Sequence, residues 1–138
     1  MKYATLAIFS LVFWSAVSFA QQEKPITVGN MPPSVVKTVP QSGDIRVDSS
    51  LHEVRVTFSK DMMTDRMWSW VMNSKETFPE IDAQKIHFLE DNRTCVLPVK
   101  LEANKTYVIW INSQKFNAFR DQANRAAIPY LLVFETKE

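Results

Sequence analysis

The chain has 138 residues, of which 16 are Lys or Arg and 15 are Asp or Glu, so its formal net charge is only +1. This balance lacks the clustered basic excess with which proteins bind nucleic acids or acidic membrane surfaces, and we expect neither as a partner. Cys95 is the single cysteine, which excludes an intrachain disulfide. We therefore expect packing alone to stabilise the fold.

The N-terminal segment, residues 1–20, has the pattern of a secretory signal peptide. Lys2 precedes an apolar run over residues 4–19, and Ser18 and Ala20 place small residues at the two positions that signal peptidase reads. Cleavage after Ala20 leaves 118 of the 138 residues, enough for one domain. The alternative is an uncleaved membrane anchor, because the run approaches the length that crosses a bilayer. Cleavage predicts an exported protein, periplasmic or secreted, with no membrane insertion afterwards.

The next segment, residues 21–33, is polar and rich in proline and has no periodicity. Such a composition is typical of a flexible leader between a cleavage site and a folded domain. We expect a single domain to occupy residues 34–138.

From residue 34 onward, short segments alternate between apolar and polar residues and are separated by turn residues. The clearest is 52–58, which directs Val54, Val56 and Phe58 to one face. Strands are predicted over residues 35–39, 52–58, 68–72, 86–88, 94–99, 106–112 and 130–136. About seven strands with almost no helical pattern predict an all-β, antiparallel β-sandwich.

Three residues in these strands carry more specific expectations. Pro98 cannot donate a hydrogen bond to a sheet, so its strand is expected at an edge or to end in a bulge. Cys95 lies in an apolar stretch, which favours a small buried hydrophobe over a reactive or dimer-forming thiol. Tyr107, at the entry to a late strand, is expected to bond its hydroxyl to nearby backbone as a tyrosine corner.

Taken together, three stretches resemble the bacterial immunoglobulin-like domain named after the surface-layer protein SbsA. They are residues 39–47 followed by the strand 54–62, the loop 101–107, and residues 121–124 with the closing strand 132–136. The resemblance spans about residues 34–137. Asn104 and Asn124 stand in turns where that family often has glycine, and asparagine tolerates the left-handed conformation. The resemblance implies an immunoglobulin-like sandwich used for surface, structural or binding roles, with no catalytic residues to transfer.

The residues themselves indicate no catalytic site. His52 and His87 are the only histidines and lie in predicted strands, and two glycines in all provide neither a nucleophile elbow nor a phosphate-binding loop. No second histidine follows His52-Glu53 to complete a zinc motif, so a small metal-dependent hydrolase is the weakest alternative. We expect no cofactor and no metal. A group of aspartates near turns, Asp44, Asp48, Asp61 and Asp65, is compatible with calcium, but turn-making is their commoner use.

The most suggestive group combines aromatic and amide side chains. Trp68, Trp70 and Trp110 are the tryptophans outside the signal region, and residues 112–121 form a long loop. Aromatic faces and amides together suit a sugar or a peptide. The candidate ligand-binding residues are Trp68, Trp70, Asn112, Asn117, Phe119 and Arg120. The alternative, which we favour, is a scaffold in which Phe116 and Phe119 anchor the loop and Arg120 pairs with Asp121 or caps backbone carbonyls.

The sequence thus predicts a non-enzymatic, exported module that acts by protein contact or as a structural element of the cell envelope. Its alternative is a carbohydrate- or peptide-binding module that uses the tryptophans and the loop. The identity of the partner, a protein or another envelope component, stays open.

Overall fold

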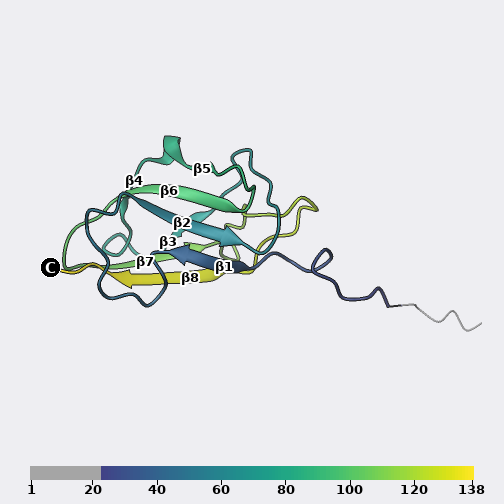
Figure 1. The fold of residues 1–138 in the computed structure, drawn as a ribbon, viewed down its shortest axis with the longest axis horizontal. Coiled ribbons are helices and arrows are strands. Elements are labelled where there is room, and N and C mark those ends of the chain that lie inside the picture. Colours follow the sequence, from purple (N-terminus) through teal and green to yellow (C-terminus); the bar gives the residue numbers. More distant parts are fainter. Residues whose placement is uncertain (1–22) are drawn as a thin grey trace, which may run out of the picture.

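The chain folds into two antiparallel sheets packed face to face, as a computed structural model of residues 23–138 shows (Figure 1). The predicted signal peptide, residues 1–20, lies outside the described residues. One sheet has the order β1-β2-β6, with β4 and β5 both pairing with β6, and the other has the order β3-β7-β8. The elements are β1 (Val35–Val39), β2 (Glu53–Phe58), β3 (Trp70–Met72), β4 (Glu80–Ile81), the 3-10 helix η1 (Ala83–Lys85), β5 (His87–Phe88), β6 (Thr94–Lys100), β7 (Thr106–Ile111) and β8 (Tyr130–Glu135). The predicted all-β sandwich is confirmed.

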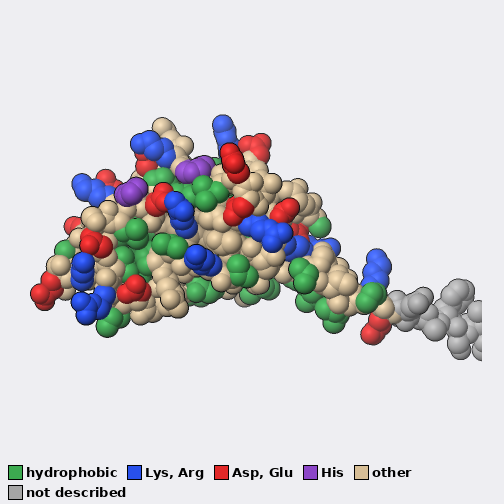
Figure 2. All heavy atoms as spheres, in the orientation of Figure 1, with side chains coloured by type: hydrophobic (Ala, Val, Ile, Leu, Met, Phe, Trp, Pro, Cys, Tyr) green, Lys and Arg blue, Asp and Glu red, His purple; other side chains and the backbone are tan. Residues whose placement is uncertain are grey.

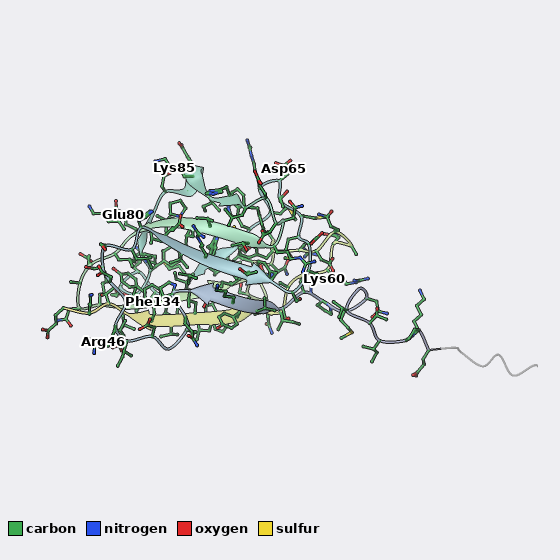
Figure 3. The ribbon with its side chains drawn as sticks, viewed as in Figure 1. Arg46, Lys60, Asp65, Glu80, Lys85 and Phe134 are labelled. Atoms are coloured by element: carbon green, nitrogen blue, oxygen red, sulfur yellow. The ribbon has the colours of Figure 1, made fainter. Side chains whose placement is uncertain are left out.

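The core lies between the sheets and follows the period-two pattern of the strands. Val54, Val56 and Phe58 of β2 are at most 1% exposed, as their alternation predicts. From the other sheet, Tyr107 and Phe134 stack with ring centroids 5.4 Å apart, and Phe134, labelled in Figure 3, is 1% exposed. The two faces therefore bury one continuous apolar layer, which is the main source of stability available to a chain without disulfides.

The expectation that Pro98 lies in an edge strand is wrong. Its strand, β6, is interior, because β2 pairs with one side of it and β4 and β5 pair with the other. Val99 donates its N–H towards β2, to the carbonyl of His52, so the nitrogen of Pro98 faces the opposite side. There β4 has ended and η1 intervenes before β5 begins. Pro98 has no backbone N–H to donate, and this position of β6 lies opposite the gap between β4 and β5, where no strand needs that hydrogen bond.

Two local expectations are confirmed. The hydroxyl of Tyr107 accepts a hydrogen bond of 2.8 Å from the backbone N–H of Glu102, which forms the predicted tyrosine corner. Asn104 and Asn124 adopt positive φ angles of 58° and 63°, so asparagine does supply the left-handed turns for which glycine is commoner.

A segment after β1 runs alongside the end of β8. Gly43 donates its N–H to the carbonyl of Val133, and Lys137 donates to the carbonyl of Val47. Val47 and Thr136 form a parallel bridge. These bonds cover the free edge of β8. In Figure 1, the described N-terminal segment and the C-terminus leave from opposite ends of the sandwich.

Candidate functional site

The loop of residues 112–121 is organised by a buried amide. Asn112 follows β7 with a φ of 60° and is fully buried. Its Nδ2 donates to the carbonyls of Phe119 and Ala127 at 2.9 and 3.1 Å, and its Oδ1 accepts from the N–H of Phe119 at 3.0 Å. The side chain therefore fixes the two ends of the loop to each other.

Asp121, at the end of this loop, is the centre of a second buried cluster. Its side chain is 1% exposed and lies 2.9 Å from the ammonium of Lys60. The Oδ1 atom accepts the N–H groups of Ala123 and Arg125. Burial alone would raise the pKa of the Asp121 carboxyl, but the N–H of Arg125, the ammonium of Lys60 and the N–H of Ala123 together hold it below its ordinary value.

The same cluster holds the segment that precedes the sandwich. Lys60 donates to the carbonyls of Gly29 and Met31, and Arg125 also donates to the carbonyl of Gly29. Figure 3 shows Lys60 where this segment meets the body of the protein. Residues 29–31, expected to belong to a flexible leader, are thus bonded to the domain.

The remaining polar residues of the loop bond mostly within it. Arg120 donates to the carbonyl of Asn124 at 2.9 Å and to Oδ1 of Asn117 at 2.6 Å. Arg120 therefore caps a carbonyl, as the scaffold interpretation predicts, but Asp121 pairs with Lys60 and Arg125 instead.

Phe119 and Phe116 have opposite environments. Phe119 is fully buried and packs against Phe58 and Trp70, with ring centroids 5.0 and 5.4 Å apart. Phe116 is 52% exposed, so the expectation that it anchors the loop is wrong. Burial also corrects the candidate ligand-binding set, because neither Asn112 nor Phe119 presents a surface that a ligand can touch.

Phe116 belongs instead to a groove beside β3, which we call the tryptophan groove. Its cavity volume is about 440 Å³. The groove separates the edge of the β3-β7-β8 sheet from the β4-η1-β5 region of the other sheet. Its lining residues are Trp68, Ser69, Trp70, Val71, Met72, Ile81, Ile86 and Phe116. Both predicted tryptophans, Trp68 and Trp70, are therefore together, whereas Arg120 and Asn117 are not among the lining residues.

A second depression, the polar hollow, adjoins the tryptophan groove and shares Trp68 and Ile86 with it. Its cavity volume is about 380 Å³. The other lining residues are Thr64, Asp65, Arg66, Gln84, His87, Phe88, Leu89 and Asn92. Asp65 projects from the surface in Figure 3. An apolar groove and a hollow rich in donors and acceptors thus meet at one indole.

The thiol of Cys95 lies beneath this region and is fully buried. Burial raises the pKa of the thiol to about 12, although the indole of Trp70 and the N–H of Val96 act in the opposite direction. The indole nitrogen of Trp70 is itself buried without a hydrogen-bond partner of ordinary geometry among residues 23–138. The environment of Cys95 confirms the prediction of a small buried hydrophobe.

Charged side chains are spread over the surface. Acidic and basic groups are interspersed on the face in Figure 2, and the two histidines lie at the surface. Asp44 and Asp48 accept N–H groups two residues ahead in their turns, the use that the sequence favours for them.

Among residues 23–138, no three His, Cys, Asp or Glu side chains are arranged to hold a metal ion. Within the same range, no helix is long and apolar enough to cross a membrane.

Six groove residues were not candidates in the sequence: Ser69, Val71, Met72, Ile81, Ile86 and Phe116. Met72 lies two residues after Trp70 and four after Trp68, so the alternation of this strand could have indicated it. Ile81 and Ile86 reach the groove only because β4 and β5 pair with β6 in the other sheet, a placement that no local pattern indicates.

A family model described as "Bacterial Ig-like domain" matches residues 29–136. The match covers most of the chain and the whole sandwich. Comparison with curated proteins gave no match, and comparison with solved structures gave none either.

Proposed function

The chain belongs to the bacterial Ig-like domain family, and from that premise we propose that it is an exported, non-enzymatic module that contacts another protein of the cell envelope through the tryptophan groove. Membership indicates a structural or interaction module. The predicted signal peptide supports export to the periplasm or the medium. We also propose the SbsA type within the family, supported by the motifs at residues 39–47, 101–107 and 121–124.

The observation that carries the proposal is the apolar surface of the groove. Phe116 and Met72 are 52% and 50% exposed, and Trp68 is only partly buried beside them. Large apolar side chains that gather in one depression of a soluble protein are typical of binding surfaces. Aromatic residues and methionine are also enriched at protein interfaces. No side chain that lines the groove carries a charge, which favours contact over catalysis.

Photocrosslinking in the producing bacterium tests this proposal. The photoreactive residue p-benzoylphenylalanine replaces Phe116 in one variant and Ile45 in another. Ile45 is the matched control, because it is 65% exposed and does not line the groove. We expect a discrete crosslinked protein from position 116 only, and its loss when Trp68→Ala is added. Equal crosslinking at both positions, or none at position 116, would contradict the proposal.

A carbohydrate is the second candidate ligand, favoured by the polar hollow. Trp68 offers an aromatic face there, and Asp65, Gln84 and Asn92 offer donors and acceptors. A glycan array with the wild type and Gln84→Ala tests it. Binding that the variant loses would support a glycan, and an array without any signal would exclude those sugars.

A further inference from the structure

The backbone of β3 presents unpaired groups to the tryptophan groove. Asn112 donates its N–H to the carbonyl of Ser69, and Val71 lies opposite Trp110 in the register of β3 and β7. In an antiparallel pair, alternate residues direct their N–H and C=O to the same neighbour. Val71 therefore faces β7, and the N–H and C=O groups of Trp70 and Met72 face outward. No residue among 23–138 forms a hydrogen bond with these outward groups.

The long edge of the same sheet differs, because β8 is covered. Gly43 and Asp44 bond to it, the second by accepting the N–H of Glu135. In the other sheet, β4 and β5 have two residues each and η1 separates them. Uncovered edge groups act as a template for another strand, and proteins usually cover, shorten or charge such edges. The β3 edge has none of these protections except its short length.

The lining of the groove selects the chemistry of the occupant. Ser69 is the only lining residue with a hydroxyl, and its Oγ already accepts the N–H of Ala118 at 2.8 Å. A sugar would leave its hydroxyls without side-chain partners there. The donors and acceptors that the groove does offer are backbone groups with strand spacing. They complement an extended polypeptide, and the uncharged lining favours uncharged side chains on it.

The geometry points to strand addition: a short extended segment of a partner protein pairs with Trp70 and Met72 at the free edge of β3. Its apolar side chains, at alternate positions, lie against Ile81, Ile86 and Phe116. This inference rests on the proposed protein contact and specifies its form. With only Trp70 and Met72 facing outward, the pairing spans about three to five residues of the partner.

Peptide selection tests the inference with a defined probe. A phage library of random dodecapeptides is selected on the mature chain, and the best binder is synthesised with a single N-methyl group at each position in turn. Strand pairing predicts that N-methylation weakens binding at every second position across the paired segment, by about fivefold or more for each lost hydrogen bond. A flat N-methyl profile would overturn strand addition, and crosslinking at position 116 would still report separately on protein contact.

The variant Met72→Pro removes one outward N–H without touching the bonds of β3 to β7. We expect weaker binding of the selected peptide to Met72→Pro than to Met72→Ala, which keeps the N–H but loses the same side chain. Thermal melts identify a variant that has lost its fold, in which case the N-methyl profile decides alone. Failure to select any peptide, selection of glycans alone on an array, or self-association of the wild type that Met72→Pro abolishes would each overturn the inference.

Discussion

The loop of residues 112–121 and the tryptophan groove both combine aromatic and polar groups, but they use them in opposite ways. In the loop, Asn112 and Asp121 are buried and their side-chain atoms bond to backbone and to Lys60. In the groove, the aromatic side chains are partly exposed, and the N–H groups of Trp70 and Met72 have no hydrogen-bond partner among residues 23–138. The two regions contain similar residue types, so composition does not distinguish them. What distinguishes a scaffold from a binding surface here is whether its polar groups already have hydrogen-bond partners within the domain.

The largest effect is expected for Asp121→Ala. The change leaves the N–H groups of Ala123 and Arg125 without their acceptor. It also removes the carboxylate partner of the Lys60 ammonium, a side chain that is 15% exposed and then keeps only two backbone carbonyls as acceptors. We expect the free energy of unfolding to fall by about 3 kcal/mol, measured by urea denaturation. Asp61→Ala is the control, because its ion pair with Arg93 is about half exposed on both sides, and such pairs contribute less than about 1 kcal/mol. An equal fall in the free energy of unfolding in Asp121→Ala and Asp61→Ala would show that the buried ion pair stabilises the fold no more than the exposed one does.

The same carboxyl predicts acid sensitivity. The pKa of Asp121 is lowered in the folded protein, so its contribution to stability is fully present above the unfolded pKa of about 3.9. That contribution is lost as the pH falls through the lowered pKa of the folded state. The stability difference between wild type and Asp121→Ala should therefore shrink in urea titrations below about pH 4. A constant difference down to pH 2 would contradict the role given to the ionised group.

A somewhat smaller loss is expected for Asn112→Ala. Three hydrogen bonds disappear in a fully buried site, and alanine is less tolerant of the φ of 60°. We expect the unfolding free energy to fall by about 2 kcal/mol. The exposed Gln114→Ala in the same loop serves as control and should melt like the wild type. If Asn112→Ala also melts unchanged, the loop does not depend on this amide.

Arg120→Ala should have an intermediate effect. Its guanidinium bonds to the carbonyl of Asn124 and to Asn117 from a partly exposed position. We expect a loss of about 1 kcal/mol in thermal or urea unfolding. Asn117→Ala should cost less, because it removes the second of these bonds and only a long one of 3.4 Å from Asn117 Nδ2 to the carbonyl of Gln114. Unchanged stability of both variants would contradict the scaffold role and leave Arg120 and Asn117 as candidate ligand-binding residues.

The smallest effect is expected for Phe116→Ala in the groove. Because its ring is 52% exposed, the unfolding free energy should change by less than about 0.5 kcal/mol. Binding of a selected peptide should nevertheless weaken measurably, by isothermal titration. A large loss of stability with unchanged peptide binding would mean that Phe116 stabilises the fold and does not contribute to a binding surface.

The sequence predicts the sandwich well because each strand carries its own alternation. Val54, Val56 and Phe58 are buried as their spacing indicates, and Tyr107 makes its corner bond within five residues. Long-range pairs have no such signal. Lys60 and Asp121 meet across the chain, and the prediction paired Arg120 with Asp121 because they are neighbours in sequence. Pro98 was misplaced for a related reason, since the interruption that accommodates it lies in another segment.

The site was predicted only in part. Trp68 and Trp70 do line one groove, but Asn112 and Phe119 were assigned to binding on residue type alone. A buried asparagine and a surface asparagine look alike in sequence, because the left-handed turn that holds Asn112 is also common in binding loops. The decisive property is which carbonyls lie opposite the amide, and only the fold supplies it.

The pairing of residues 43–47 with the end of β8 has a mechanical consequence. Both segments run in the same direction, and the two ends of the described chain leave on opposite sides of the sandwich (Figure 1). A stretching force between the ends pulls these two segments in opposite directions along their length. The bonds of Gly43 and Val47 to β8 are then sheared together instead of being unzipped one after another. Tension along the long axis therefore loads these bonds at the same time.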